Sequence, residues 1–118
     1  MRIISVDDVS TNLLLIEAMA KNLNVKIHSF TDPQEALAFA QQEPFDLALV
    51  DYEMPHMNGI ELIQKIRLMN KDVPVVMITA VSDNDRIKLR AIQSGATEFL
   101  NKPLNAAEFV ARLKNLLQ

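Results

Sequence analysis

Five polar residues stand at or just after the ends of short apolar runs: Asp7, Asp8, Asp51, Thr79 and Lys102. Three carboxylates held within a few ångströms of one another repel, and burial in surroundings of low dielectric constant makes that repulsion costly. A hard divalent cation relieves it, and Mg²⁺ suits a site that offers carboxylates, waters and a phosphate oxygen. An ammonium and a hydroxyl can each meet a phosphoryl oxygen. The set therefore indicates a carboxylate nucleophile beside groups that can bind a phosphoryl group.

Each of these residues also has a simpler interpretation when it is taken alone. Asp7 and Asp8 could cap a helix, and Asp51 could be a carboxylate in a turn. Thr79 could merely end a strand, and Lys102 could be a solvated lysine. The chemical interpretation therefore depends on whether the fold brings all five to one place.

Apolar, β-branched runs alternate with segments of helical period along the whole chain. The runs predict strands at 3–6, 25–30, 47–50, 73–78 and 97–100. The amphipathic segments predict helices at about 13–22, from 33 through 40, at about 59–70, at about 84–94 and from 105 to the end. Asp32-Pro33 and Asn105 are typical of helix starts, and Gly95 is typical of a helix stop.

Strict alternation of strands and helices with short connections predicts a single α/β domain over residues 1–118. We expect a doubly wound, five-stranded parallel sheet with helices on both faces, in the flavodoxin-like order 2-1-3-4-5. Ligands of such a sheet bind outside the carboxyl ends of its strands. The five polar residues all fall at that edge, which favours the chemical interpretation.

Composition excludes several other classes of protein. The chain has 118 residues, a net charge of −3 and no cysteine, which leaves no disulfide, thiolate metal site or thiol redox chemistry. No basic cluster indicates direct binding of nucleic acid. No apolar stretch approaches the roughly 20 residues that span a bilayer, and the start of the chain has no secretory signal. We expect a cytoplasmic protein.

The runs ISVDD, LALVDYEMPHMNG, VVMITA and GATEFLNKP resemble the receiver domains of two-component response regulators. The resemblance implies that Asp51 accepts a phosphoryl group from a histidine kinase or a phosphotransfer protein. It implies that Asp7, Asp8, Asp51 and the main-chain carbonyl of Glu53 bind Mg²⁺, or Mn²⁺ in its place. Lys102 matches the family's lysine, and the resemblance implies a cis peptide bond between Lys102 and Pro103.

The resemblance also implies a switch. Thr79 and Phe99 match the pair of residues whose rearrangement reports phosphorylation, although Phe99 stands where a tyrosine is common. The fourth helix and fifth strand are then the surface on which a second copy or an effector domain would dock. The runs DYEMPHMNGIELI and EFLNKPLNAAEFVARLKNLL are similar to receivers that precede cyclic-di-GMP phosphodiesterase domains.

Three other functions are alternatives to a signalling switch that catalyses only its own phosphorylation and dephosphorylation. A phosphatase resembling haloacid dehalogenases would need an aspartate at position 53, where this chain has Glu53, and a longer chain. A flavodoxin-like electron carrier would need a loop rich in Ser, Thr and Gly after the first strand, where Asp7-Asp8 would repel a phosphate. An interaction module that is never phosphorylated would be expected to lack Asp51 or Lys102.

Overall fold

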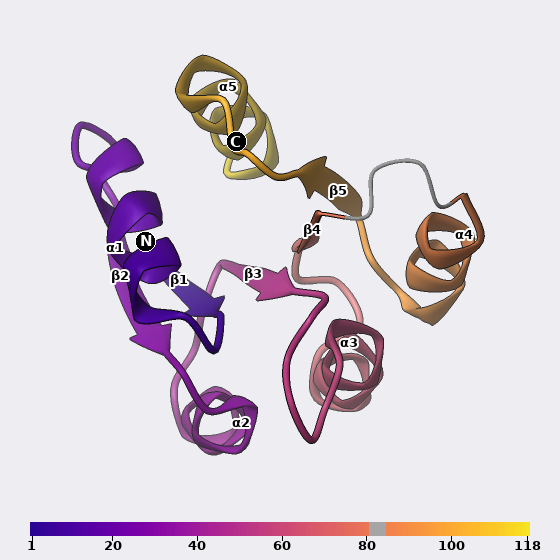
Figure 1. Cartoon of the computed structure of the whole chain (residues 1–118). Helices are drawn as coiled ribbons and strands as arrows, with labels where there is room; N and C mark the ends of the chain where they lie inside the picture. The colour runs from indigo at the N-terminus through magenta and orange to yellow at the C-terminus, as the bar shows by residue number, and fades with distance from the viewer. Residues whose placement is uncertain (81–84) are drawn as a thin grey trace.

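The computed structural model describes residues 1–80 and 85–118, and in these residues five strands alternate with five helices (Figure 1). The strands are β1 (Arg2–Val6), β2 (Lys26–Phe30), β3 (Leu47–Asp51), β4 (Val75–Thr79) and β5 (Glu98–Asn101). The helices are α1 (Ser10–Met19), α2 (Pro33–Gln42), α3 (Gly59–Met69), α4 (Asp85–Ser94) and α5 (Ala106–Leu116).

The strands form one parallel sheet in the order β2-β1-β3-β4-β5, which confirms the predicted fold class. Val6 of β1 is paired with Val50 of β3, and Thr79 of β4 is paired with Asn101 of β5. Because this register keeps the strand ends level, the residues that follow the strands meet at a single edge.

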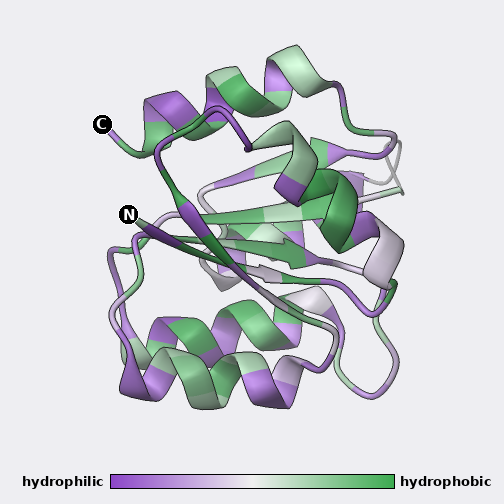
Figure 2. Ribbon diagram, turned by 90° about the vertical axis from the view of Figure 1, so that its left-hand side faces the viewer, coloured by the Kyte–Doolittle hydropathy of each residue, from purple (hydrophilic) through white to green (hydrophobic). Residues whose placement is uncertain are grey.

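Helices cover both faces of the sheet: α1 and α5 lie on one face, and α2, α3 and α4 lie on the other (Figure 1). Ile16, Phe109 and Leu113 belong to the buried cluster on the first face, and Leu37 and Ile63 to the cluster on the second. Hydrophobic colouring is concentrated in the middle of the sheet and on the inner sides of the helices (Figure 2). The sheet therefore separates two apolar cores.

The predicted helix signals have the expected geometry. The Asp32 carboxylate accepts a hydrogen bond of 2.9 Å from the Gln34 amide, and the Asn105 side chain accepts one of 2.9 Å from the Glu108 amide. Gly95 follows α4 with a φ of 116°, a left-handed conformation that glycine adopts without steric cost. These residues fix where α2, α4 and α5 begin or end.

Several predicted boundaries were wrong. The first helix ends at Met19 rather than near residue 22, because Leu23 packs on the core from the turn beyond the helix. The fourth strand begins at Val75 rather than at Val73, because Pro74 has no amide to donate to the sheet. Val73 is buried all the same, which gave it the appearance of a strand residue.

The first helix also begins at Ser10, three residues before its predicted start at about 13. The other boundaries differ by one or two residues, as with the fifth strand, which covers Glu98–Asn101 instead of 97–100. The predicted start of the fourth helix, Asn84, lies outside the described residues. In the part of the chain that is described, no helix has the length and apolar composition needed to cross a membrane.

Candidate functional site

The carboxyl ends of four strands supply the candidate site. Asp7 follows β1, and its amide donates a 3.1 Å hydrogen bond to the Phe30 carbonyl at the end of β2. Asp51 is the last residue of β3, and Thr79 is the last residue of β4. The Lys102 amide donates a 2.9 Å hydrogen bond to the Thr79 carbonyl, which extends the pairing of β5 with β4 by one residue.

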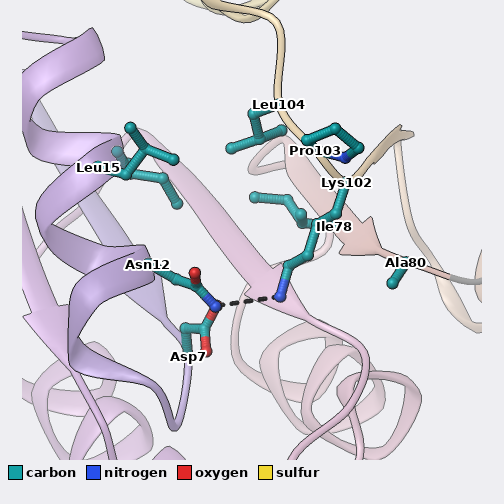
Figure 3. Close-up of a pocket in the computed structure, with 9 residues that line it drawn as sticks. Asp7, Asn12, Leu15, Ile78, Ala80, Lys102, Pro103 and Leu104 are labelled. Carbon is teal, nitrogen blue, oxygen red and sulfur yellow. Dashed lines mark hydrogen bonds and ion pairs between the residues drawn. The ribbon is translucent and has the colours of Figure 1, made fainter.

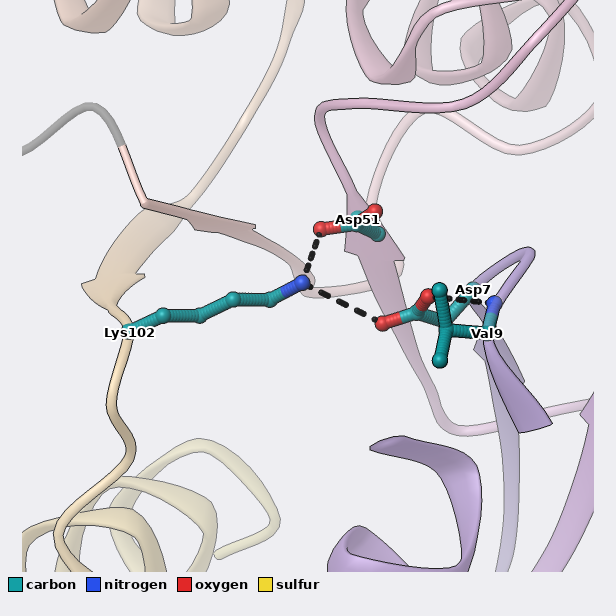
Figure 4. Close-up of polar contacts among 4 residues, drawn as sticks. All are labelled: Asp7, Val9, Asp51 and Lys102. Carbon is teal, nitrogen blue, oxygen red and sulfur yellow. Dashed lines mark hydrogen bonds and ion pairs between the residues drawn. The ribbon is translucent and has the colours of Figure 1, made fainter. Parts of the chain in front are cut away.

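Lys102 reaches across this edge between two carboxylates (Figure 4). Its ammonium nitrogen lies 2.8 Å from Asp51 Oδ1 and 3.4 Å from Asp7 Oδ2. The other Asp7 oxygen, Oδ1, accepts a 2.9 Å hydrogen bond from the Val9 amide at the start of α1. Both carboxylates are therefore oriented by the fold before any ligand binds.

The three aspartates form one acidic cluster. Asp7, Asp8 and Asp51 each offer a carboxylate oxygen, and these oxygens all lie within 4.8 Å of one another. Asp7 and Asp51 are each only 3% exposed, whereas Asp8 is open to solvent. An all-oxygen set with two fixed ligands and one accessible ligand fits a hard divalent cation that keeps part of its water shell.

The charges of the site act on one another. Burial raises the pKa of the Asp51 carboxyl to about 6, the hydrogen bond from Lys102 opposes that rise, and the negative charge of Asp7 adds to it. Burial acts to lower the pKa of Lys102, but the hydrogen bond and charge of Asp51, together with Asp7, raise it above the ordinary value. Lys102 therefore stays protonated near neutral pH, and Asp51 keeps a carboxylate there at an energetic cost.

Thr79 is fully buried at the end of β4. Phe99 lies on the neighbouring strand, paired with Met77, and its partly buried side chain packs against the core on the α2–α3–α4 face. The structure thus brings the two residues of the predicted switch onto adjacent strands, one buried and the other partly open to solvent.

The Glu53 side chain is exposed in the loop after Asp51, and its carbonyl as a metal ligand stays a prediction. The peptide bond between Lys102 and Pro103 is cis, as predicted.

Gly59 is a site-forming residue that the sequence reasoning missed. A Cβ atom there would lie 2.7 Å from the Asp51 carbonyl oxygen and 2.9 Å from Tyr52 Cα, too close for any other residue type. The Gly59 amide also donates a 2.9 Å hydrogen bond to the Tyr52 carbonyl. The available signal was the glycine directly after Asn58, whose side chain caps α3, because glycine allows a close approach of two backbones.

A largely apolar pocket of about 440 Å³ opens beside Asp7 and Lys102, between α1 and the segment that joins β5 to α5 (Figure 3). Leu15 and Leu104 line its apolar part, and Asn12 lies at its polar end. Sequence reasoning did not identify this pocket. The exposed Leu15 on α1 was the available signal, but only the structure shows which side chains lie across the pocket from it.

Comparison with known proteins agrees with this geometry. Residues 3–114 match the family model described as the response regulator receiver domain. The chain is 34% identical to the cyclic di-GMP phosphodiesterase response regulator RpfG of Xanthomonas campestris, over 100% of this chain and 32% of that protein. It is 33% identical to the regulatory protein VanRc of Enterococcus gallinarum, over 99% of this chain and 50% of that protein. The chain thus spans half or less of these relatives.

Two solved structures are similar over nearly the whole chain. The chemotaxis protein CheY4 of Vibrio cholerae superposes with a TM-score of 0.90 at 28% identity, covering 98% of both chains. The receiver domain of the sensor histidine kinase PA1611 from Pseudomonas aeruginosa has a TM-score of 0.87 at 28% identity, covering 98% of this chain and 96% of its own. The latter structure has a magnesium ion coordinated in its active-site cleft.

Proposed function

This chain belongs to the response regulator receiver domain family, and from that premise we propose that it is a phosphorylation-dependent switch with Asp51 as its phosphoacceptor. The observation that carries the proposal is the Asp51 carboxylate at the end of β3, 2.8 Å from the Lys102 ammonium and beside Asp7 and Asp8. Asp7 shares the cluster and the lysine, but its contact with the Lys102 ammonium is longer, at 3.4 Å, and its other oxygen already accepts a hydrogen bond from the Val9 amide.

The proposed reaction transfers a phosphoryl group from a phosphohistidine to Asp51. A carboxylate oxygen of Asp51 attacks phosphorus, an O–P bond forms, and the N–P bond of the donor breaks with its electron pair left on the imidazole. A bound divalent cation supplies positive charge to the phosphoryl oxygens and to the carboxylates. Asp7, Asp8 and Asp51, with the Glu53 carbonyl, are the groups that would hold Mg²⁺ or Mn²⁺.

Lys102 and Thr79 stabilise the product in this proposal. The Lys102 ammonium already lies within reach of two carboxylates, so it can contact a phosphoryl oxygen on Asp51 with little movement of the backbone. The Thr79 hydroxyl donates to another phosphoryl oxygen. Because hydrogen bonds to a charged acceptor are stronger than those to a neutral one, phosphorylation draws Thr79 toward Asp51.

Phe99 then responds to the movement of Thr79. The ring turns inward into the space that Thr79 leaves, and its further burial favours that state because each Å² of apolar surface removed from water contributes about 25 cal/mol. The surface of α4 and β5 changes as a result, and a second copy or an effector domain can recognise the change. The similarity to RpfG supports an effector related to cyclic-di-GMP signalling.

The proposed donor is a sensor histidine kinase or a phosphotransfer protein, and we expect the switch to act in the cytoplasm, where kinases have access to ATP. The chain's own catalysis is limited in this proposal to its phosphorylation and dephosphorylation. Nucleic acid is not a proposed partner of this domain, whose net charge is −3.

Mass spectrometry after incubation with acetyl phosphate tests the assignment. We expect the addition of one phosphoryl group in the presence of Mg²⁺ or Mn²⁺, and none in chelator, because Asp7 and Asp8 then have no cation to hold against the incoming charge. Asp51→Ala should not be labelled, whereas Asp72→Ala, which removes an exposed acid, should be labelled like the wild type. Undiminished labelling of Asp51→Ala would contradict the assignment of Asp51 as the phosphoacceptor.

A further inference from the structure

The ring of Phe99 has a positively charged neighbour from another element. The ammonium nitrogen of Lys88, on α4, lies 4.8 Å from the centroid of the Phe99 ring on β5. Both residues are partly buried. A cation at this distance from an aromatic face is attracted by the quadrupole of the ring.

Lys88 forms no ion pair with a carboxylate of the described residues. The ion pairs formed among residues 1–80 and 85–118 do not include Lys88. The nearby cation of α5, Arg112, is instead paired with Glu98, the residue that precedes Phe99 on β5. The ring of Phe99 is therefore the contact that orients the Lys88 ammonium in the described part of the chain.

We propose that the ammonium of Lys88 holds the Phe99 ring in its partly exposed position and so opposes activation of the switch. We call this contact the latch. The inference rests on the proposed function, in which the ring turns inward when Thr79 moves toward a phosphoryl group. A ring that turns inward leaves the ammonium behind, so the contact exists in only one of the two states. An interaction made in one state alone shifts the equilibrium toward that state.

The absence of a hydroxyl makes this contact important. A phenylalanine cannot be held outward by a hydrogen bond, and among the described residues Lys88 is the cation that contacts the face of its ring. A cation–π contact at a partly exposed site changes such an equilibrium by about two- to fivefold. By reciprocity, removal of the contact strengthens binding of a phosphoryl mimic by the same factor.

The test compares three variants with the wild type. Lys88→Met keeps a long apolar stem and removes the charge, and Lys88→Arg keeps a cation that can lie over the ring. Arg90→Met removes a charge from an exposed position of the same helix. NMR of ¹³C-labelled phenylalanine rings, assigned with Phe99→Leu, reports the two positions of Phe99. Titration with beryllofluoride and Mg²⁺ reports the affinity for a phosphoryl mimic.

Without beryllofluoride, Lys88→Met should increase the ratio of inward to outward Phe99 by about two- to fivefold, and its affinity for beryllofluoride should rise by the same factor. Lys88→Arg and Arg90→Met should behave like the wild type. The latch is refuted when Lys88→Met leaves both quantities unchanged, or when Arg90→Met changes them equally. Failure of the wild type to bind beryllofluoride would instead refute the proposed function, and the ligand-free ring populations would still test Lys88.

Discussion

Asp51 and Lys102 form an ion pair whose two members have opposite consequences for the fold. The carboxylates near Lys102 raise its pKa and so stabilise the charged ammonium. Asp51 loses from burial, which raises its pKa to about 6 and makes the carboxylate costly in the folded state. In the proposed function Asp51 is the nucleophile, and a bound cation or phosphoryl group would reduce the cost of its negative charge.

The pH dependence of stability in chelator follows from Asp51. Between pH about 4 and pH about 6 the folded protein keeps a proton that the unfolded chain has lost, so the free energy of unfolding should fall as the pH rises through this window. Above the window, Asp51→Asn should be more stable than the wild type by up to about 2 kcal/mol, and the difference should vanish near pH 4.

Urea unfolding at several pH values, with chelator present throughout, measures this difference. Glu35→Gln is the matched control, because Glu35 is exposed on α2 and its removal should change stability by less than about 0.5 kcal/mol at every pH. A wild type that gains stability between pH 4 and pH 6 relative to Asp51→Asn would contradict the prediction.

At the scale of elements, the sequence predicts a strand well where an apolar run ends in a polar residue. The unbroken run Leu47–Val50 followed by Asp51 predicted a strand with a carboxylate at its end, and the structure has both in β3. Val73 was misassigned because burial and strand pairing leave the same apolar signature, and only the missing amide of Pro74 separates them. The Lys88–Phe99 contact could not be predicted, since it depends on where two side chains from different elements point.

Gly59 gives the prediction at this scale. In an unobstructed helix, alanine in place of glycine stabilises by up to about 1 kcal/mol, but here the methyl group would meet the backbone of Asp51 and Tyr52, which cannot yield cheaply. We therefore expect Gly59→Ala to destabilise the fold by about 1–3 kcal/mol and to slow labelling of Asp51, because α3 must move away from the loop.

Thermal or urea unfolding and the rate of acetyl phosphate labelling measure the two effects. Lys65→Ala, at an exposed position of the same helix, should leave stability within about 0.5 kcal/mol of the wild type and labelling unchanged. A Gly59→Ala protein as stable as the wild type would show that the contact with the Asp51 carbonyl relaxes freely.

At the scale of the whole molecule, the site joins four strands and therefore the two layers of helices. A ligand bound at the proposed site would contact residues at the ends of β1, β3 and β5, which are dispersed when the chain unfolds. Ligand binding to the folded state alone stabilises it by mass action, independently of any change in the cores.

We predict that beryllofluoride with Mg²⁺ raises the free energy of unfolding by about 2.7 kcal/mol at a ligand concentration about 100 times its dissociation constant. Urea unfolding with and without the ligand measures the gain, and neither component alone should reproduce it. Asp51→Asn should show no gain. Equal stabilisation of that variant would place the ligand elsewhere on the protein.

The sheet divides the apolar interior into two cores, and successive residues of one strand pack into different cores. Ile3 belongs to the core beneath α1 and α5, and Ile4 to the core beneath α2, α3 and α4; Leu49 and Val50 divide in the same way. The pocket beside α1 and the Lys88–Phe99 contact lie on opposite sides of this division. During evolution each layer of helices can therefore acquire new surface residues and new partners separately, while the aspartates and the lysine at the strand ends stay as they are.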